Sequence, residues 1–469
     1  MSSSLYEFAM IGLGTMGRNL LLNIADHGYP VTGFDKDPVK TGHLESSATG
    51  GQTVKGVNSL EEMVSLVKGP RRIMLLVPAG APVDSVLEEL VPLLEEGDIV
   101  IDGGNSHFTD TLRRIQRWEG SKIHFIGMGV SGGEKGARTG PSIMPGGDKQ
   151  AWQHLKPILE SIAAKVNEEP CVAYMGKNAA GHYVKMVHNG IEYAIMQMIS
   201  EVYDFLKRAL GYSNEELHLV FSNWNKGELQ SFLVEITADI FLKKDDASGQ
   251  ALVDLILDKA GSKGTGKWTS QEAMDLPVPL PTIDMAVSMR DMSGYKDERV
   301  MASQLYKPAV KDLSANRDKL LIQTQDALYL ATLLAYAQGL SMLATASRVR
   351  EMEIPMKDVV RIWRGGCIIR SAQLELFTAA YKKNPDLQNI LLDKKIASLV
   401  KKKQAALRKI VQQFAAARIP GGALMSALAY LDSYTSERMS TNLVQAQRDY
   451  FGAHTYQRID QPGSFHTEW

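Results

Sequence analysis

Cysteine is nearly absent from this sequence. The 469 residues include two cysteines, Cys171 and Cys367, and neither lies in a Cys-x-x-Cys or Cys/His pattern. A disulfide scaffold and a cysteine-built zinc site are therefore not expected, and a reducing compartment, the cytoplasm, fits best. No cluster of His, Asp and Glu has metal-ligand spacing, so the sequence predicts no metal.

The sequence also lacks an excess of either charge. Lys and Arg total 52 and Asp and Glu total 53, so the formal net charge is −1. Binding to nucleic acid or to an anionic membrane surface by general attraction requires net positive charge, so neither partner is predicted. A local cationic pocket remains compatible with this balance. The length favours two or three domains.

Long hydrophobic runs are scarce. The first residues show no basic segment before an apolar run, so no signal peptide is expected. One stretch, residues 327–347, carries no charge over 21 positions and is long enough to span a bilayer. Tyr336, Gln338 and other polar residues dilute it. We therefore expect a helix buried inside a helical domain.

The first 177 residues alternate short β-rich runs with helix-length spacers. The expected strands are Glu7–Gly12, Val31–Asp35, Arg72–Val77, Asp98–Asp102 and Ile123–Gly127. Continuous apolar strands separated by helices are typical of a parallel sheet that is covered on both faces. The sequence predicts an α/β, doubly wound, Rossmann-like domain over residues 1–177.

From residue 178 onward, apolar residues recur three and four positions apart, which is typical of helices. The expected helices include Val184–Arg208, Leu229–Leu242, Ala327–Arg350 and Lys394–Ala417. We predict a large all-α domain over residues 178–436, whose size favours an internal duplication. Residues 437–469 lack a helical period and carry aromatics, so they are expected to form a C-terminal tail that docks elsewhere, for example on a partner subunit.

A glycine-rich loop follows the first expected strand. It reads Gly12-Leu13-Gly14-Thr15-Met16-Gly17 and opens a helix, as in dinucleotide-binding domains. The glycines would serve a tight turn, close approach to a pyrophosphate and close helix–strand packing, and the helix N-terminus would face the phosphates. Asp35 follows the second strand, where a carboxylate accepts hydrogen bonds from the ribose and repels a 2′-phosphate. NAD+ is favoured, although Lys36 could attract such a phosphate and leaves NADP+ open.

A polar stripe occurs in a largely apolar helical segment. Lys185, His188, Asn189 and Glu192 share one face because their offsets are 0, 3, 4 and 7. An exposed stripe on an amphipathic helix is one interpretation, but the apolar flanks favour a buried helix that lines a cleft. A lysine that acts as a base near neutral pH needs its pKa lowered by about 3 units, roughly 4 kcal/mol.

Three loops carry small or cationic residues. Residues 261–268 contain Lys263 and Thr265 and could surround an anion, or could be a flexible surface turn. Residues 102–106 and 129–133 lie beyond strand ends, where a doubly wound sheet places its ligands. Their small residues would let a nicotinamide and a carboxylate approach the backbone.

The whole sequence, from Gly12 to Trp469, resembles the decarboxylating 6-phosphogluconate dehydrogenase family in its long-chain form. The most specific motif is Asp-Lys-Ala-Gly-Ser-Lys-Gly-Thr-Gly-Lys-Trp at 258–268, supported by residues 102–106, 129–133 and Trp363–Arg370. The resemblance implies oxidative decarboxylation of 6-phosphogluconate to ribulose 5-phosphate and CO2 with NAD(P)+, in the pentose phosphate pathway. It also implies a homodimer in which each tail enters the other subunit.

The resemblance further implies roles for individual residues. Lys185 would be the general base, and Glu192 the general acid. The positions that match substrate-binding residues are Asn105, Ser131, Gly132, Gly133, His188, Asn189, Tyr193, Lys263, Thr265 and Arg290, with Arg448 and His454 from the partner's tail. The matching cofactor positions are the loop Gly12–Gly17, Asp35, Lys36, Asp37, Val77 and Asn105.

Two departures from the family pattern concern the cofactor. Many NADP-using members carry Asn-Arg-Thr where this sequence has Asp35-Lys36-Asp37, and Pro78 stands where a lysine is common. Two alternative functions remain open. A simple 3-hydroxyacid dehydrogenase that does not decarboxylate would share the glycine loop and the Lys185 helix, without needing Glu192, Lys263 or the tail. A catalytically silent NAD(P)-binding sensor would not need the Lys185/Glu192 pair.

Overall fold

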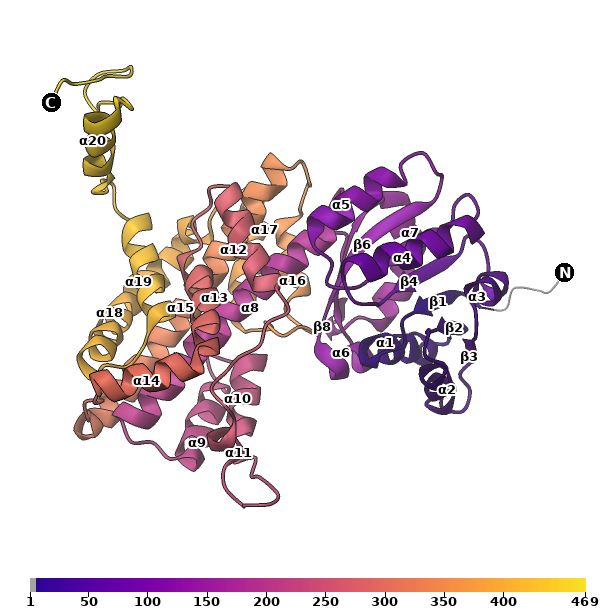
Figure 1. Ribbon diagram of the computed structural model, residues 1–469, viewed down its shortest axis with the longest axis horizontal. Coiled ribbons are helices and arrows are strands. Elements are labelled where there is room, and N and C mark those ends of the chain that lie inside the picture. Colours follow the sequence, from indigo (N-terminus) through magenta and orange to yellow (C-terminus); the bar gives the residue numbers. More distant parts are fainter. Residues whose placement is uncertain (1–5) are drawn as a thin grey trace.

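The computed structural model describes residues 6–469, and a seven-stranded sheet forms the centre of its N-terminal part (Figure 1). The strands are β1 (Phe8–Ile11), β2 (Val31–Phe34), β3 (Val54–Val57), β4 (Arg72–Leu75), β5 (Ile99–Asp102), β6 (His124–Ser131) and β7 (Ser142–Gly147), in the order β3-β2-β1-β4-β5-β6-β7. The strand order reverses between β1 and β4, and ligands bind at such a point, beyond the carboxyl ends of the strands.

Two strands of this sheet were not predicted, and one of them runs antiparallel to its neighbour. β3 has the sequence Val-Lys-Gly-Val, and β7 contains Pro145, Gly146 and Gly147, which are rare in strands. β7 runs antiparallel to β6, whereas β1 to β6 pair in parallel, as predicted. The glycines of β7 make room for the next domain, because a Cβ on Gly146 would lie 2.2 Å from the Gly181 nitrogen.

Seven helices cover the sheet on both faces, as predicted. They are α1 (Thr15–Asp26), α2 (Pro38–Ser46), α3 (Leu60–Leu66), α4 (Ala81–Leu90), α5 (Phe108–Arg117), α6 (Gly133–Thr139) and α7 (Lys149–Ile162). Side chains alternate along β1, so Phe8 and Met10 pack with α1 and α7, whereas Ala9 and Ile11 pack with α3 and α4. A small hairpin, β8 (Lys165–Val166) and β9 (Glu169–Pro170), follows α7.

The remaining chain is helical. Its helices are α8 (Ala180–Asp204), α9 (Asn214–Trp224), α10 (Phe232–Leu242), α11 (Leu252–Leu255), α12 (Thr265–Asp275), α13 (Pro281–Gly294), α14 (Lys296–Tyr306), α15 (Arg317–Val349), α16 (Met356–Ile362), α17 (Gln373–Lys383), α18 (Lys394–Ala417), α19 (Gly422–Tyr434) and α20 (Thr441–Gly452). α15 contacts both α8 and α18. It contains the one segment among residues 6–469 that is apolar and long enough to span a membrane, and 94% of its most apolar window is buried, which confirms the predicted core helix.

The C-terminal tail differs from the prediction, because it contains the helix α20. This helix stands apart from the other helices, beyond α19 (Figure 1). Its apolar side chains, among them Tyr450 and Phe451, are exposed, and Asp449 is its buried residue. Leu443, Ala446 and Tyr450 recur three and four positions apart, so α20 carries a short apolar face that the prediction from the sequence missed.

Candidate active site

A cleft with a volume of about 640 Å³ lies between the sheet domain and the helical domain. It is lined by predicted residues from six separate segments of the sequence. The predicted residues that line it are Met16, Asn105, Ser131, Gly132, Gly133, Lys185, Asn189, Glu192, Tyr193, Lys263, Thr265 and Arg290. These segments, which lie up to 274 positions apart in the sequence, from Met16 to Arg290, therefore meet around one cavity.

Helix α8 reaches the cleft because it crosses the sheet at unusually close range. A Cβ on Gly181 would lie 2.2 Å from the Gly127 carbonyl oxygen, and a Cβ on Gly129 would lie 2.4 Å from the Lys185 Cβ. Two of the glycines on β6 therefore accommodate α8. The sequence had assigned Gly129 to ligand approach, whereas in the structure this glycine places Lys185 at the cleft.

Lys185 and Glu192 both line the cleft from the same face of α8, as the offsets predicted. Lys185 is only 6% exposed. Burial lowers the pKa of the Lys185 ammonium below its ordinary value, and Glu192 opposes that shift. Burial raises the pKa of the Glu192 carboxyl, against the opposing effect of Lys185 and Arg290. Both shifts move the pKa toward neutral pH, which favours a neutral amine on Lys185 and a protonated carboxyl on Glu192.

His188 lies behind the cleft wall. Its ring is fully buried, with Nε2 3.2 Å from Ser131 Oγ and Nδ1 3.1 Å from Asn189 Oδ1. Burial, and then Lys185, lower the pKa of His188 well below its ordinary value, so the ring is neutral. A neutral imidazole that bonds Ser131 orients this hydroxyl, and Ser131 itself lines the cleft.

The loop 261–268 forms one end of the cleft and continues into α12. Gly264, with φ +91°, immediately precedes the helix, whose first residue Thr265 is buried. A Cβ on Gly266 would lie 2.4 Å from the Tyr193 ring, and the Arg290 guanidinium lies 3.6 Å above the same ring. The positive end of α12 therefore lies in the same cleft as two cationic side chains, Lys263 and Arg290. This arrangement favours the anion-binding interpretation over a simple surface turn.

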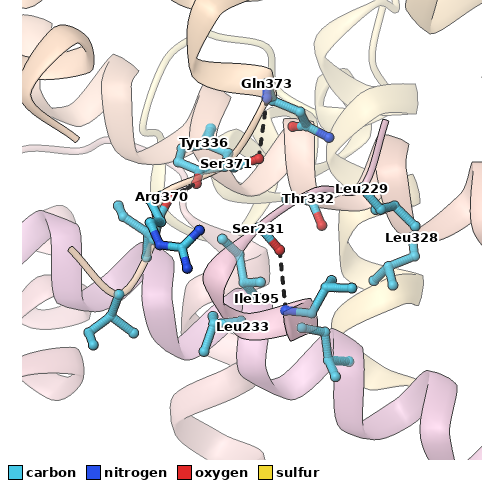
Figure 2. A pocket seen from close by; sticks show the side chains of 14 residues that line it. Ile195, Leu229, Ser231, Leu233, Leu328, Thr332, Tyr336, Arg370, Ser371 and Gln373 are labelled. Atoms are coloured by element: carbon cyan, nitrogen blue, oxygen red, sulfur yellow. Dashed lines mark hydrogen bonds between the residues drawn. The ribbon is translucent and has the colours of Figure 1, made fainter. Parts of the chain in front are cut away.

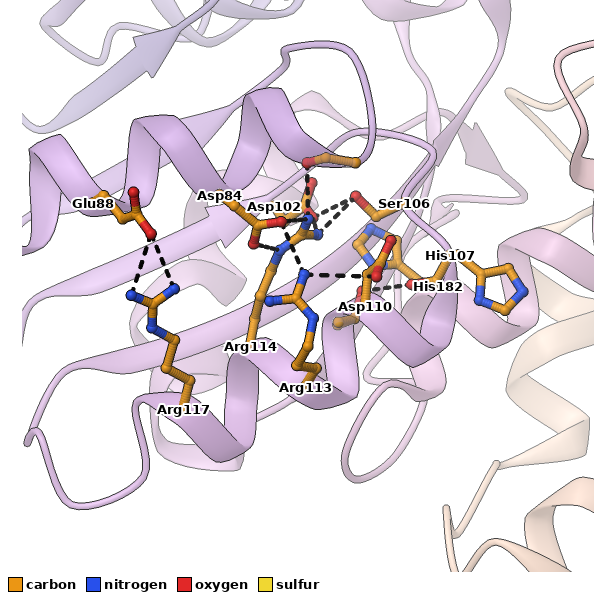
Figure 3. A network of polar contacts seen from close by, with 12 residues as sticks. Asp84, Glu88, Asp102, Ser106, His107, Asp110, Arg113, Arg114, Arg117 and His182 are labelled. Atoms are coloured by element: carbon orange, nitrogen blue, oxygen red, sulfur yellow. Dashed lines mark hydrogen bonds and ion pairs between the residues drawn. The ribbon is translucent and has the colours of Figure 1, made fainter.

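A buried ion network holds the loop that carries Asn105. Figure 3 shows the Arg114 guanidinium between Asp84, Asp102 and Ser106. Arg114 Nε lies 2.8 Å from Asp84, Nη1 lies 3.2 Å from Asp102, and the Arg114 side chain is 1% exposed. Hydrogen bonding from Arg114 lowers the pKa of Asp84 to about 2. The network fixes residues 102–106 after β5, with Asn105 directed to the cleft.

A second cavity, with a volume of about 410 Å³, lies at the carboxyl ends of β1, β2 and β4. Its lining includes Gly12, Gly14, Asp35, Lys36 and Val77. Gly12 has φ +96°, and a Cβ there would lie 2.5 Å from the Leu76 carbonyl oxygen. A Cβ on Gly17 would overlap the Gly12 carbonyl, whereas the space beside Gly14 is open. These glycines have the three separate functions that the dinucleotide fingerprint predicts.

The two acidic residues that follow β2, Asp35 and Asp37, have different hydrogen-bond partners. Asp35 accepts a hydrogen bond from the Leu13 nitrogen at 2.8 Å and pairs with Lys40 at 3.3 Å. The Asp37 side chain accepts from the Val39 nitrogen at 3.0 Å and caps α2, and it does not line the cavity. Asp35 therefore lines this cavity, whereas the Asp37 side chain caps α2.

Models of two protein families match the chain. That of the "NAD binding domain of 6-phosphogluconate dehydrogenase" covers residues 7–176, and that of the "6-phosphogluconate dehydrogenase, C-terminal domain" covers residues 181–469. The chain belongs to the 6-phosphogluconate dehydrogenase family. The family explains why a nucleotide-binding sheet and a large helical domain share one cleft.

Relatives in this 6-phosphogluconate dehydrogenase family align along nearly the whole chain. The NADP(+)-dependent, decarboxylating enzyme of Bacillus subtilis is 51% identical over 99% of both chains. Decarboxylating enzyme 1 of Saccharomyces cerevisiae is 48% identical over 98% of this chain and 94% of its own. The structure of the Plasmodium falciparum 6-phosphogluconate dehydrogenase superposes with a TM-score of 0.96, at 42% identity, over 99% of this chain and 100% of that one.

The two substrate-binding residues predicted in the C-terminal tail of this family member lie outside the cleft. Arg448 and His454 belong to the separate C-terminal tail, where Arg448 is exposed and contacts Gln445 at 3.0 Å. The structure of one chain therefore does not bring them to Lys185. Among residues 6–469, no group of three His, Cys, Asp or Glu side chains is arranged to hold a metal ion.

Residues 363–370 form a supporting wall to which the sequence assigned no role. The Ile368 nitrogen donates to Ser131 Oγ at 3.4 Å, and a Cβ on Gly132 would lie 2.6 Å from the Gly366 carbonyl oxygen. Figure 2 shows a small cavity behind this wall, where Tyr336 donates its hydroxyl hydrogen to the Ile369 carbonyl. The motif holds two glycines and two arginines, Arg364 and Arg370, and its sequence gave no signal for this role apart from its quoted resemblance to the family.

Proposed function

We propose that this chain oxidises and decarboxylates 6-phosphogluconate to ribulose 5-phosphate and CO2, with reduction of NAD(P)+. The observation that carries the proposal is that Lys185 and Glu192 share one cleft with a cationic end. Lys263, Arg290 and the N-terminus of α12 suit a phosphate at that end. The Ser131–Gly133 loop suits a carboxylate near Lys185.

The proposed chemistry divides the proton transfers between two residues. Bound NAD(P)+ supplies the acceptor for the hydride that leaves C3 of the substrate. Lys185, whose pKa is lowered by burial, takes the proton of the 3-hydroxyl group and then, as an ammonium, stabilises negative charge on that oxygen while CO2 leaves. Glu192, whose pKa is raised by burial, donates a proton to the carbon that lost CO2.

We also infer that NAD+ is preferred over NADP+. Asp35 lines the dinucleotide cavity after β2, where a carboxylate favours a free ribose and repels a 2′-phosphate. The two relatives named with a cofactor, from B. subtilis and P. falciparum, are described with NADP+. A preference for NAD+ would distinguish this chain from these two relatives.

The proposed assembly is a homodimer in which each α20 docks on the other subunit. Supporting this, the exposed side chains of Leu443, Tyr450, Phe451 and Trp469 surround a cavity of about 550 Å³ on the tail. A helix with such an apolar face gains little stability alone and requires a surface to cover it. Arg448 and His454 would then reach the partner's cleft and complete its anion site.

One assay tests the proposed reaction. With 6-phosphogluconate and each cofactor, we expect equal molar amounts of reduced cofactor and CO2, and a higher kcat/KM with NAD+. Reduced cofactor without CO2 would indicate the simple 3-hydroxyacid dehydrogenase, and cofactor binding without turnover would indicate a sensor. A kcat/KM for NADP+ at least tenfold above that for NAD+ would refute the inferred cofactor preference.

A further inference from the structure

An ion pair spans the mouth of the dinucleotide cavity. Lys36, which follows β2 and Asp35, places Nζ 3.2 Å from Glu89 Oε1 on α4. The Ser85 hydroxyl also lies 3.4 Å from this oxygen. Lys36, Ser85 and Glu89 all line the cavity, together with Asp35. Both charged side chains are solvent-exposed.

The position of this pair relates it to the adenosine ribose. A carboxylate at the end of the second strand marks where the 2′-oxygen of the ribose binds, and here that carboxylate is Asp35. Binding of a 2′-phosphate at this point requires a cation without a partner. The two lysines that line the cavity are both paired, Lys40 with Asp35 and Lys36 with Glu89. Two lysines and two carboxylates leave no net positive charge for a phosphate dianion.

We propose that Glu89 is a second specificity-determining residue against the 2′-phosphate of NADP+, and that it acts by holding Lys36 in this ion pair. Asp35 repels the 2′-phosphate, and Glu89 engages Lys36, one of the two lysines that line the cavity. The proposal rests on the proposed use of a dinucleotide, but it concerns only binding of its adenosine end. It assigns selectivity to a residue on α4, far in sequence from the β2 motif.

Binding measurements test this without turnover. The dissociation constants of NAD+ and NADP+ are measured by calorimetry on the full chain, without sugar substrate, for the wild type and for Glu89→Gln. We expect the affinity for NADP+ relative to NAD+ to rise about fivefold, the upper end for an exposed ion pair. Raising the salt concentration should reduce this gain, because exposed charges are screened. A lost packing contact would show no such salt dependence.

A neighbouring residue provides the control. Glu88 precedes Glu89 on α4 but pairs with Arg117, outside the cavity, at 3.2 Å. Glu88→Gln removes the same charge from the same helix and should leave the affinity ratio unchanged. An equal gain in Glu88→Gln would overturn the proposal, because it would show a general effect of charge.

A double-mutant cycle tests whether Glu89 acts through Lys36. In a Lys36→Ala background, Glu89→Gln should change the ratio of affinities less than about 1.5-fold, since no partner remains to be released. An undiminished gain in that background, or no gain in the single variant, would overturn the proposal. These outcomes are independent of the proposed reaction, because an enzyme that fails to decarboxylate still gives both dissociation constants.

Discussion

Helices α8 and α20 both carry predicted site residues, but they differ in what surrounds them. On α8, nineteen of the 25 residues are buried, and the glycine contacts with β6 hold Lys185 in place. On α20, Asp449 is buried and most of the other side chains are exposed. Contacts within its own chain hold α8 in place. Helix α20 is folded, but its apolar side chains stay exposed in the single chain.

The shape of the tail comes from a single carboxylate. Asp449 accepts hydrogen bonds from the Thr455 and Thr467 nitrogens at 2.9 and 3.0 Å, and from the Trp469 ring nitrogen at 3.0 Å. Hydrogen bonds from His466, Thr467, Trp469 and Thr455 outweigh burial and lower the pKa of Asp449 to about 2. The tail is therefore folded within the single chain. This comparison supports the proposal that α8 acts within its own chain and α20 acts between chains.

The largest effect on activity is expected from a substitution on the buried helix α8. Lys185→Met removes the proposed base while keeping an unbranched side chain in the buried site. The initial rate of NAD(P)H formation from 6-phosphogluconate should fall by about 10³–10⁴-fold, the upper range for general base catalysis. A thermal melt close to that of the wild type would exclude unfolding as the cause. Turnover near the normal rate would refute the assignment.

A smaller effect is expected for Glu192→Gln, roughly 10²-fold in kcat, because the substitution removes the proton donor but leaves the base. Oxidation should persist, so rapid mixing should show a burst of NAD(P)H before a slow steady state. If the burst disappears together with the steady-state rate, Glu192 would be needed for oxidation, contrary to the proposed division of roles.

On the exposed helix α20, Arg448→Ala should raise KM for 6-phosphogluconate by roughly 10- to 100-fold. The reason is the loss of one charge-assisted hydrogen bond, which contributes about 1.5–3 kcal/mol. The KM for the cofactor should change little. Arg458→Ala, in the same tail but paired with Asp460, serves as a control. Equal effects of the two substitutions would indicate that tail folding, and not substrate contact, was lost.

The smallest effect is a shift in pH dependence. Neutral Lys185 is the active form, so kcat/KM should rise as the pH increases through the pKa of this lysine. The Glu192 carboxylate raises that pKa, in opposition to burial. Glu192→Gln should therefore move the acidic limb of the pH profile to lower pH. A shift to higher pH, or no shift, would show that the limb belongs to another group.

The sequence was most informative where local spacing decides the structure. The offsets of Lys185, His188, Asn189 and Glu192 predicted one helix face, and Lys185, Asn189 and Glu192 line the cleft from it. The glycine spacing at 12, 14 and 17 predicted the turn, the open approach and the close packing. The five predicted strands were confirmed for the same reason, since each is a continuous apolar run.

Contacts between distant segments could not be predicted in this way. The Ile368 nitrogen meets Ser131 across 237 positions, and the charge on Arg114 gives no sign that this side chain is buried beneath the Asn105 loop. The missed helix α20 has a different cause. Its apolar spacing, at Leu443, Ala446 and Tyr450, extends over only about two turns and was overlooked.

Mixing two inactive variants tests most directly whether α8 acts within one chain and α20 between chains. Lys185→Met and a variant lacking residues 437–469 are dissociated, mixed in equal amounts and allowed to reassociate. A hybrid dimer would contain one site with its own Lys185 and the partner's intact tail. The account predicts recovery to roughly a quarter of the wild-type rate from random pairing. Mixed dimers that form without any recovery of activity would contradict it.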